Sequence, residues 1–251
     1  MRRLIRPMRD EVIVLVLMSG LLGTINLAGA YEVDPTIAGV TVSGRITFVG
    51  SLPRAEVMPV HRDSKFCGEM MLTEALQVEH ASRGISGVVI SLEGVAKGKP
   101  VVPENLPLTF ENRTCRFIPR VSVAVVGSVL EIVNSDPILH NTHVRLGNRF
   151  GPTVINVAQP AGTRVIRKPI REVGFLDVRC DAHTFMRASI PVFEHPYFVV
   201  TDRAGRFELT QVPPGTYRLR IWHETLGSRE KAITIPATGP VTVDLELGPE
   251  G

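Results

Sequence analysis

The chain has 251 residues, of which 44% are hydrophobic and 21% are charged. This length and composition allow one or two domains with apolar cores, and they exclude a disordered, highly charged chain. The formal net charge is only +3 and the chain has three cysteines. We therefore expect no nucleic-acid partner, which a basic protein surface would indicate, and no disulfide-rich scaffold.

Residues 1–30 have the three parts of a secretory signal. Basic residues that include Arg2 and Arg3 precede an apolar stretch at 12–22, and the small residues at 28–30 suit signal peptidase. An uncleaved membrane anchor is the alternative, but the apolar stretch is shorter than the ~20 residues of a membrane span. The arginine pair leaves twin-arginine export open. We expect a periplasmic or extracellular protein, in a compartment where disulfides persist.

Beyond the signal, apolar and polar residues alternate with a period of two, which is typical of strands with one buried face. Turn residues separate the alternating segments, and no long helical period is present, although a short helix is expected at 70–77. Strands are predicted at 42–48, 87–92, 120–125, 129–133, 163–169, 174–179, 188–193, 206–209, 217–221 and 241–247. The sequence therefore predicts an all-β chain of two antiparallel sandwiches.

Two turn signals mark the last hairpins, Asp202 with Gly205 and Pro214 with Gly215. Proline presets φ and glycine tolerates positive φ, so both pairs suit tight turns. With its flanking strands, this stretch resembles the carboxypeptidase regulatory-like (transthyretin-like) family. The resemblance implies a small β-sandwich at the C-terminal end of the chain.

In that family two further strands, similar to 42–48 and 87–92, come shortly before the turn signals. Here a long stretch of chain separates them from the turns. The resemblance therefore implies a split regulatory-like domain, made of 42–97 and 198–248, with a second domain at 105–194 inserted in one loop. The alternative is a tandem order, in which all residues before Glu194 form one enlarged sandwich.

The residues with the most specific chemistry lie in two segments. His140 lies in the first, at 134–143, and Cys180, His183 and Met186 lie in the second with Cys-x-x-His-x-x-Met spacing. A thiolate, two imidazoles and a thioether are the soft and borderline ligands that copper prefers, and a His, Cys, His set with a weak axial Met defines a blue-copper site. The alternative is a buried thiol with ordinary packing residues around it.

The region 105–194 looks like a cupredoxin, a Greek-key β-sandwich that binds one copper ion, and it is most similar to the amicyanin-like members of that family. The resemblance rests on the Cys-x-x-His-x-x-Met loop and on the His-Asn-x-His stretch that begins at His140. It implies four copper ligands: His140, Cys180, His183 and Met186.

The resemblance also implies roles for neighbouring residues. Asn141 would link the two ligand loops by hydrogen bonds, and His143 would be a neighbour that is not a ligand. His183 would lie near the surface as the entry point for electrons, with Phe185 in an apolar rim around it.

Once Cys180 is assigned to the metal, Cys67 and Cys115 are the natural disulfide pair. Their separation of 48 residues would give about 4 kcal/mol of loop-entropy stabilisation. The alternative is that Cys67, together with Met70 and Met71, forms a soft Cu(I) docking patch. A disulfide from Cys180 to either of the others would abolish the copper site.

We therefore expect an exported type 1 copper protein that carries single electrons and is not an enzyme, since the sequence contains no nucleophile motif and no second copper cluster. Partners would be redox proteins such as c-type cytochromes or a periplasmic dehydrogenase. A copper-binding chaperone and a metal-free adhesion or scaffold module are the alternatives. His195 and His223 are expected to be packing residues at a domain junction, with a second metal site or a docking surface as the alternative.

Overall fold

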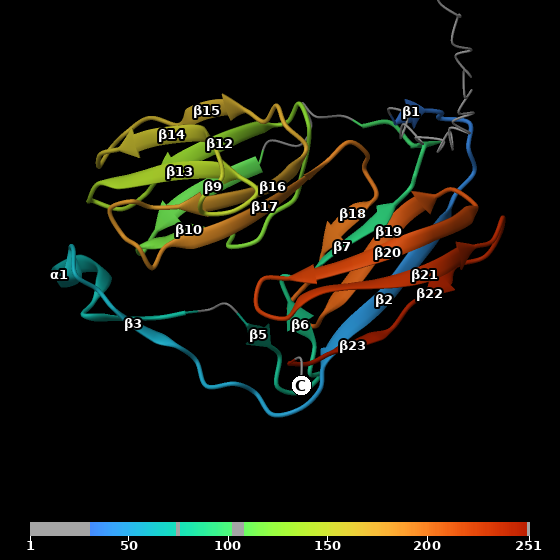
Figure 1. The fold of residues 1–251 in the computed structure, drawn as a ribbon, viewed down its shortest axis with the longest axis horizontal. Helices are drawn as coiled ribbons and strands as arrows, with labels where there is room; N and C mark the ends of the chain where they lie inside the picture. Colours follow the sequence, from blue (N-terminus) through green and yellow to red (C-terminus); the bar gives the residue numbers. More distant parts are fainter. Residues whose placement is uncertain (1–30, 74–75, 102–107, 250–251) are drawn as a thin grey trace, which may run out of the picture.

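The computed structural model describes residues 31–73, 76–101 and 108–249, so the signal predicted at 1–30 lies outside the described residues. Two β-sandwiches are visible in Figure 1, one built from the middle of the chain and the other from segments on both sides of it. We call the first the central sandwich (residues 108–193). The second, the outer sandwich, consists of residues 40–48, 89–93 and 198–247.

Two sheets form the central sandwich, with the strand orders β10-β9-β12-β15 and β11-β17-β16-β13-β14. The strands of the first sheet are β9 (Leu108–Arg113), β10 (Arg116–Ile118), β12 (Val129–Asn134) and β15 (Ile166–Pro169). Those of the second are β11 (Ala124–Val125), β13 (His140–Leu146), β14 (Thr153–Gln159), β16 (Gly174–Arg179) and β17 (Arg187–Phe193). Every second residue of β12 is buried, and these side chains meet those of the other sheet in one core.

The outer sandwich also has two sheets, ordered β18-β7-β20-β21 and β19-β2-β22, with β23 paired to β2. Its strands are β2 (Val40–Phe48), β7 (Val89–Glu93), β18 (Phe198–Val200), β19 (Arg206–Val212), β20 (Gly215–His223), β21 (Gly227–Ile235), β22 (Val241–Thr242) and β23 (Leu245–Leu247). A second core unites these strands, so segments before and after the central sandwich are packed together.

A tight turn joins β18 to β19 in the outer sandwich. The carbonyl of Asp202 accepts a hydrogen bond of 3.0 Å from the backbone N–H of Gly205. Gly205 has φ +76°, and a Cβ at this position would lie 2.2 Å from the carbonyl oxygen of Ile46. The turn therefore requires glycine both for its backbone conformation and for its close approach to β2.

Three small two-stranded sheets complete the described fold. They pair β1 (Glu32–Val33) with β8 (Lys97–Gly98), β3 (Val57–Pro59) with β4 (Met70–Leu72), and β5 (Gln77–Val78) with β6 (Ile85–Ser86). The short helix α1 (Ser64–Cys67) lies between β3 and β4. We call residues 57–72, which comprise β3, α1 and β4, the cover segment. No helix among the described residues is long and apolar enough to span a membrane.

The all-β prediction is confirmed, but several element boundaries differ. The helix expected at 70–77 is wrong, because β4 and β5 lie there and α1 lies earlier. Met71 is buried while Met70 and Leu72 are exposed, which is the alternation of a strand that pairs with β3. The strand expected at 241–247 is interrupted because an Asp244 oxygen, in place of a backbone carbonyl, accepts the N–H of Arg45 at 2.8 Å.

Candidate metal centre

His140 is the first residue of β13 and is completely buried. Its Nε2 lies 2.8 Å from Oδ2 of Asp136, and its buried Nδ1 has no hydrogen-bond partner among the described residues. Burial lowers the pKa of His140, and the hydrogen bond with Asp136 acts in the opposite direction. Because the carboxylate accepts from Nε2–H, Nδ1 carries a free lone pair that can bind a metal.

Cys180 directly follows β16, and its thiol is both free and buried. The N–H of Asn141 points to Sγ at 3.4 Å, and Nδ1 of His183 lies 3.6 Å from Sγ. Burial raises the pKa of Cys180, while hydrogen bonds from the backbone N–H groups of Asn141, His183 and Ala182 act to lower it. Without a metal the group is therefore a thiol, and metal binding would displace its proton.

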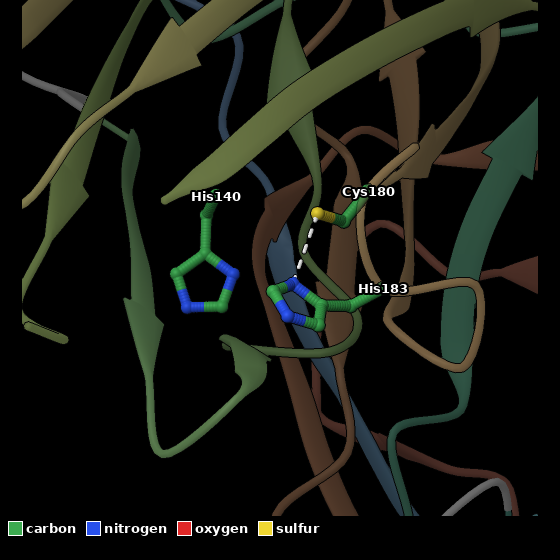
Figure 2. Close-up of side chains that lie close together, drawn as sticks. All are labelled: His140, Cys180 and His183. Carbon is green, nitrogen blue, oxygen red and sulfur yellow. Dashed lines mark hydrogen bonds between the residues drawn. The ribbon is translucent and has the colours of Figure 1, made fainter. Parts of the chain in front are cut away.

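The loop from Cys180 to Met186 is closed by two backbone hydrogen bonds. The N–H of Met186 donates to the carbonyl of His183 at 2.9 Å, and the N–H of Cys180 donates to the carbonyl of Met186 at 3.4 Å. Figure 2 shows the rings of His140 and His183 beside the sulfur of Cys180. One ligand atom from each of the three residues lies within 4.8 Å of the other two, and Met186 is buried in the same core as Cys180.

His183 is not at the surface, contrary to what the family resemblance implied. Only 1% of the residue is exposed, because Asp63 of the cover segment lies over its outer edge. Nε2 of His183 is 2.9 Å from Oδ2 of Asp63. Phe185 of the same loop is also buried, with its ring centroid 5.7 Å from that of His183, and so it packs beside His183 and does not form an exposed rim.

Asn141 connects the two loops that carry the candidate ligands. Its side-chain oxygen accepts a short hydrogen bond from the N–H of Asp181, and its Nδ2 donates to Oδ2 of Asp181 at 3.0 Å. His143 has both ring nitrogens engaged, Nδ1 at 3.0 Å from the Asp181 carboxylate and Nε2 at 2.7 Å from Oγ1 of Thr153. With both nitrogens occupied, His143 has none left for the metal.

Cys67 and Cys115 form a disulfide in the structure. Cys67 is the last residue of α1, and Cys115 lies in the turn between β9 and β10, so the bond ties the cover segment to the central sandwich. The alternative of a soft Cu(I) patch is therefore wrong, because Cys67 is oxidised and Met71 is buried.

His195 and His223 lie outside the His–Cys–His cluster. Nδ1 of His195 accepts the N–H of Tyr197 at 3.3 Å, and Nδ1 of His223 accepts the N–H groups of Thr225 and Leu226. Burial is the main cause that lowers the pKa of both, that of His223 to about 4. Both histidines therefore act as packing residues whose ring nitrogens accept backbone N–H groups of the turns that follow them.

Two carboxylates at the site, Asp63 and Asp136, were not predicted from the sequence. Asp136 lies four residues before His140, and this spacing was a signal that could have identified it. Asp63 is 120 residues from His183, and no local pattern connects the two.

A comparison with known families agrees with the first of the two expected resemblances. Residues 186–248 match the family model of the carboxypeptidase regulatory-like domain. No curated protein matches the chain.

Similar solved structures include two copper proteins. The copper-containing nitrite reductase of Thermus scotoductus SA-01 is 23% identical over 39% of this chain, with a TM-score of 0.32, and the match spans only 24% of the reductase chain. Amicyanin from Paracoccus versutus is 19% identical, with 41% of this chain and 96% of amicyanin covered and a TM-score of 0.30. At such identities and TM-scores, the inference of copper rests on the side chains of the site itself. The chain thus contains a carboxypeptidase regulatory-like domain and, in its central sandwich, a buried cluster of metal-ligand side chains.

Proposed function

We propose that this chain is an exported type 1 copper protein that carries single electrons between redox partners. One observation carries the proposal: a buried Nδ1 of His140 without a hydrogen-bond partner in the described chain faces the free thiol of Cys180 and the Nδ1 of His183. A thiolate and two imidazoles suit copper. When bound, copper would alternate between Cu(II) and Cu(I) and so exchange one electron.

Each candidate ligand has a defined protonation requirement. His140 would bind through Nδ1 while its Nε2–H stays hydrogen-bonded to Asp136. Cys180 would bind after losing its thiol proton. The N–H of Asn141 would then stabilise the thiolate, because it already points to Sγ. Met186, buried at the end of the same loop, would supply a weakly bound thioether.

Electron transfer is fast when the ligands move little between the two copper states. The register of β13 with β16, in which His143 lies opposite Arg179, brings the ends of these strands together and places His140 near Cys180. The hydrogen bonds of Asn141 to Asp181 fasten the two ligand loops to each other. This frame supports an electron carrier, because a stiff frame limits reorganisation of the ligands.

We propose no enzymatic activity, since His, Cys, His and Met would fill the coordination positions and leave none for a substrate. Partners would be redox proteins such as c-type cytochromes or a periplasmic dehydrogenase, bound through small transient interfaces. The secretory signal proposed for 1–30 would deliver the chain to the periplasm or outside the cell. The regulatory-like domain would hold the copper sandwich, which we propose is inserted between its segments 42–97 and 198–248.

Voltammetry of the copper-loaded protein tests the proposal against its alternatives. An electron carrier gives a reversible one-electron wave that is absent from the Cys180→Ala variant. A Cu(I) chaperone would bind Cu(I) far more tightly than Cu(II) and give no reversible wave. A metal-free adhesion or scaffold module would bind neither ion at stoichiometric concentration. Either of these two results contradicts the proposal.

A further inference from the structure

The cover segment, residues 57–72, belongs to neither sandwich yet packs against the candidate metal centre. Its inner face places Val60 and Met71 in the core of the central sandwich, with Met58 packed against them. The backbone N–H of Val60 donates to the carbonyl of Glu69 at 2.9 Å, so β3 and β4 hold the segment as a closed hairpin around α1. This hairpin delivers a single polar side chain, Asp63, to a ligand histidine.

Asp63 has a backbone conformation that is unusual for a residue with a side chain. It precedes α1 with φ +55°, and its carboxylate makes no hydrogen bond that caps the helix. Its carbonyl accepts the N–H groups of Phe66 and Cys67 at 2.9 Å, which fixes Asp63 relative to the disulfide cysteine. The carboxylate instead lies 2.9 Å from Nε2 of His183, and a side-chain exposure of 32% shows that it covers the histidine from the solvent side.

The other end of the disulfide leads to the other histidine. The N–H of Cys115 donates to Oδ2 of Asp136 at 2.8 Å, and that of Thr114 donates to Oδ1 at 2.7 Å. The same Asp136 carboxylate lies 2.8 Å from Nε2 of His140. The Cys67–Cys115 bond therefore joins two short chain segments, one of which carries Asp63 to His183, while the other holds the Asp136 carboxylate beside His140 through its backbone N–H groups.

We propose that Asp63 is a positioning residue for the metal centre: by accepting the Nε2–H of His183, it holds this ring with Nδ1 toward Cys180 and closes the site to solvent. The inference rests on the proposed copper function. Asp136 does the same for His140, so two carboxylates anchored at the two ends of one disulfide fix both imidazoles. Carboxylates that hold metal-ligating histidines in this way typically raise metal affinity by about 10–100-fold. We expect Asp63 to raise the metal affinity of this site by roughly the same factor.

Two substitutions separate the carboxylate from the backbone conformation. Asp63→Gly removes the side chain at a positive φ that glycine adopts without strain. Asp63→Asn retains an oxygen that can accept Nε2–H, and asparagine also tolerates positive φ. Glu69→Gln is the matched control, because it removes an exposed acidic charge from the same cover segment without contact to His183.

The first readout is copper binding by the full-length protein, measured by competition with a chelator and by the visible absorption spectrum. We expect Asp63→Gly to weaken Cu(II) binding by about 10–100-fold and to shift the absorption band. Asp63→Asn should recover part of both effects, and Glu69→Gln should match the wild type. If Asp63→Gly has the affinity and band of Glu69→Gln, the positioning role is refuted.

The second readout needs no copper. Cys180 is the one free thiol, so its alkylation by iodoacetamide, followed by mass spectrometry, reports how open the site is. Asp63→Gly should raise the alkylation rate at least several-fold over wild type and control, and equal rates in all three would refute the closure. A wild-type protein that binds no Cu(II) would overturn the proposed function, while this second readout would still decide whether Asp63 closes the site.

Discussion

Replacing Asp136 by alanine should destabilise the central sandwich severely, because its carboxylate satisfies several buried donors. Oδ1 accepts the N–H of Thr114 at 2.7 Å, and Oδ2 accepts the N–H of Cys115 and faces Nε2 of His140, both at 2.8 Å. Leaving a buried donor without a partner costs about 1–3 kcal/mol. Thr114 is exposed and its amide is only partly buried, so its N–H contributes the low end of this range, and the three donors together give a loss of about 3–7 kcal/mol.

The assay is urea unfolding of the metal-free protein with its disulfide intact. Asp202→Ala is the matched control, since its carboxylate also accepts three hydrogen bonds, from the N–H of Ala204 and from the N–H and Nε of Arg206, but in an exposed turn. Water can replace those bonds, so its loss should stay below about 1 kcal/mol. Equal losses for Asp136→Ala and Asp202→Ala would refute the argument that burial of the donors sets the cost.

Three further predictions follow from single features of the fold. Replacing Cys67 and Cys115 together by serine should lower the free energy of unfolding, measured with urea, by up to about 4 kcal/mol. Mass spectrometry should count one free thiol in the wild-type protein, and a count of three would exclude the disulfide. His223, with its pKa lowered to about 4, stays neutral in the folded chain while the unfolded chain protonates near pH 6.5. The contribution of His223 to the free energy of unfolding should therefore be fully present above pH 6.5 and should fall by about 3 kcal/mol as the pH drops to 4. A His223→Asn variant whose free energy of unfolding depends on pH as that of the wild type does would contradict this prediction. Because burial raises the pKa of the Cys180 thiol, metal binding must release the thiol proton. The apparent Cu(II) affinity should therefore rise about tenfold per pH unit below that pKa. A chelator competition series in which the affinity does not change with pH would contradict this prediction.

The sequence alone predicted those residues of the candidate site whose side chains are typical metal ligands. Cys180 and His183 are close in the chain, and a soft-ligand loop after a strand limits how they can fold. The strands at 129–133 and 174–179 were evident because their buried residues alternate with period two.

Other elements carried no such pattern. β13 was missed because it begins at His140 and buries polar side chains, Thr142 and His143 among them, where apolar residues would mark a strand. β21 was missed because its first half is exposed and polar, as expected for a strand at the edge of a sheet.

The contact of Asp63 with His183 could not be predicted from the sequence for a different reason. Its residues are 120 positions apart, and the contact depends on a hairpin fixed by a disulfide and on a positive φ at Asp63. The buried state of His183 follows from this contact. A resemblance to the ligand loop alone therefore placed the histidine at the surface.

The most direct test of a thiolate–copper centre is the visible absorption spectrum during titration of the metal-free protein with Cu(II). We predict an intense thiolate-to-copper charge-transfer band that saturates at one equivalent. The band should be lost in Cys180→Ala and retained in His143→Ala, whose ring nitrogens are both engaged elsewhere. A titration that yields no such band, or a band that survives the loss of the Cys180 sulfur, would contradict the account.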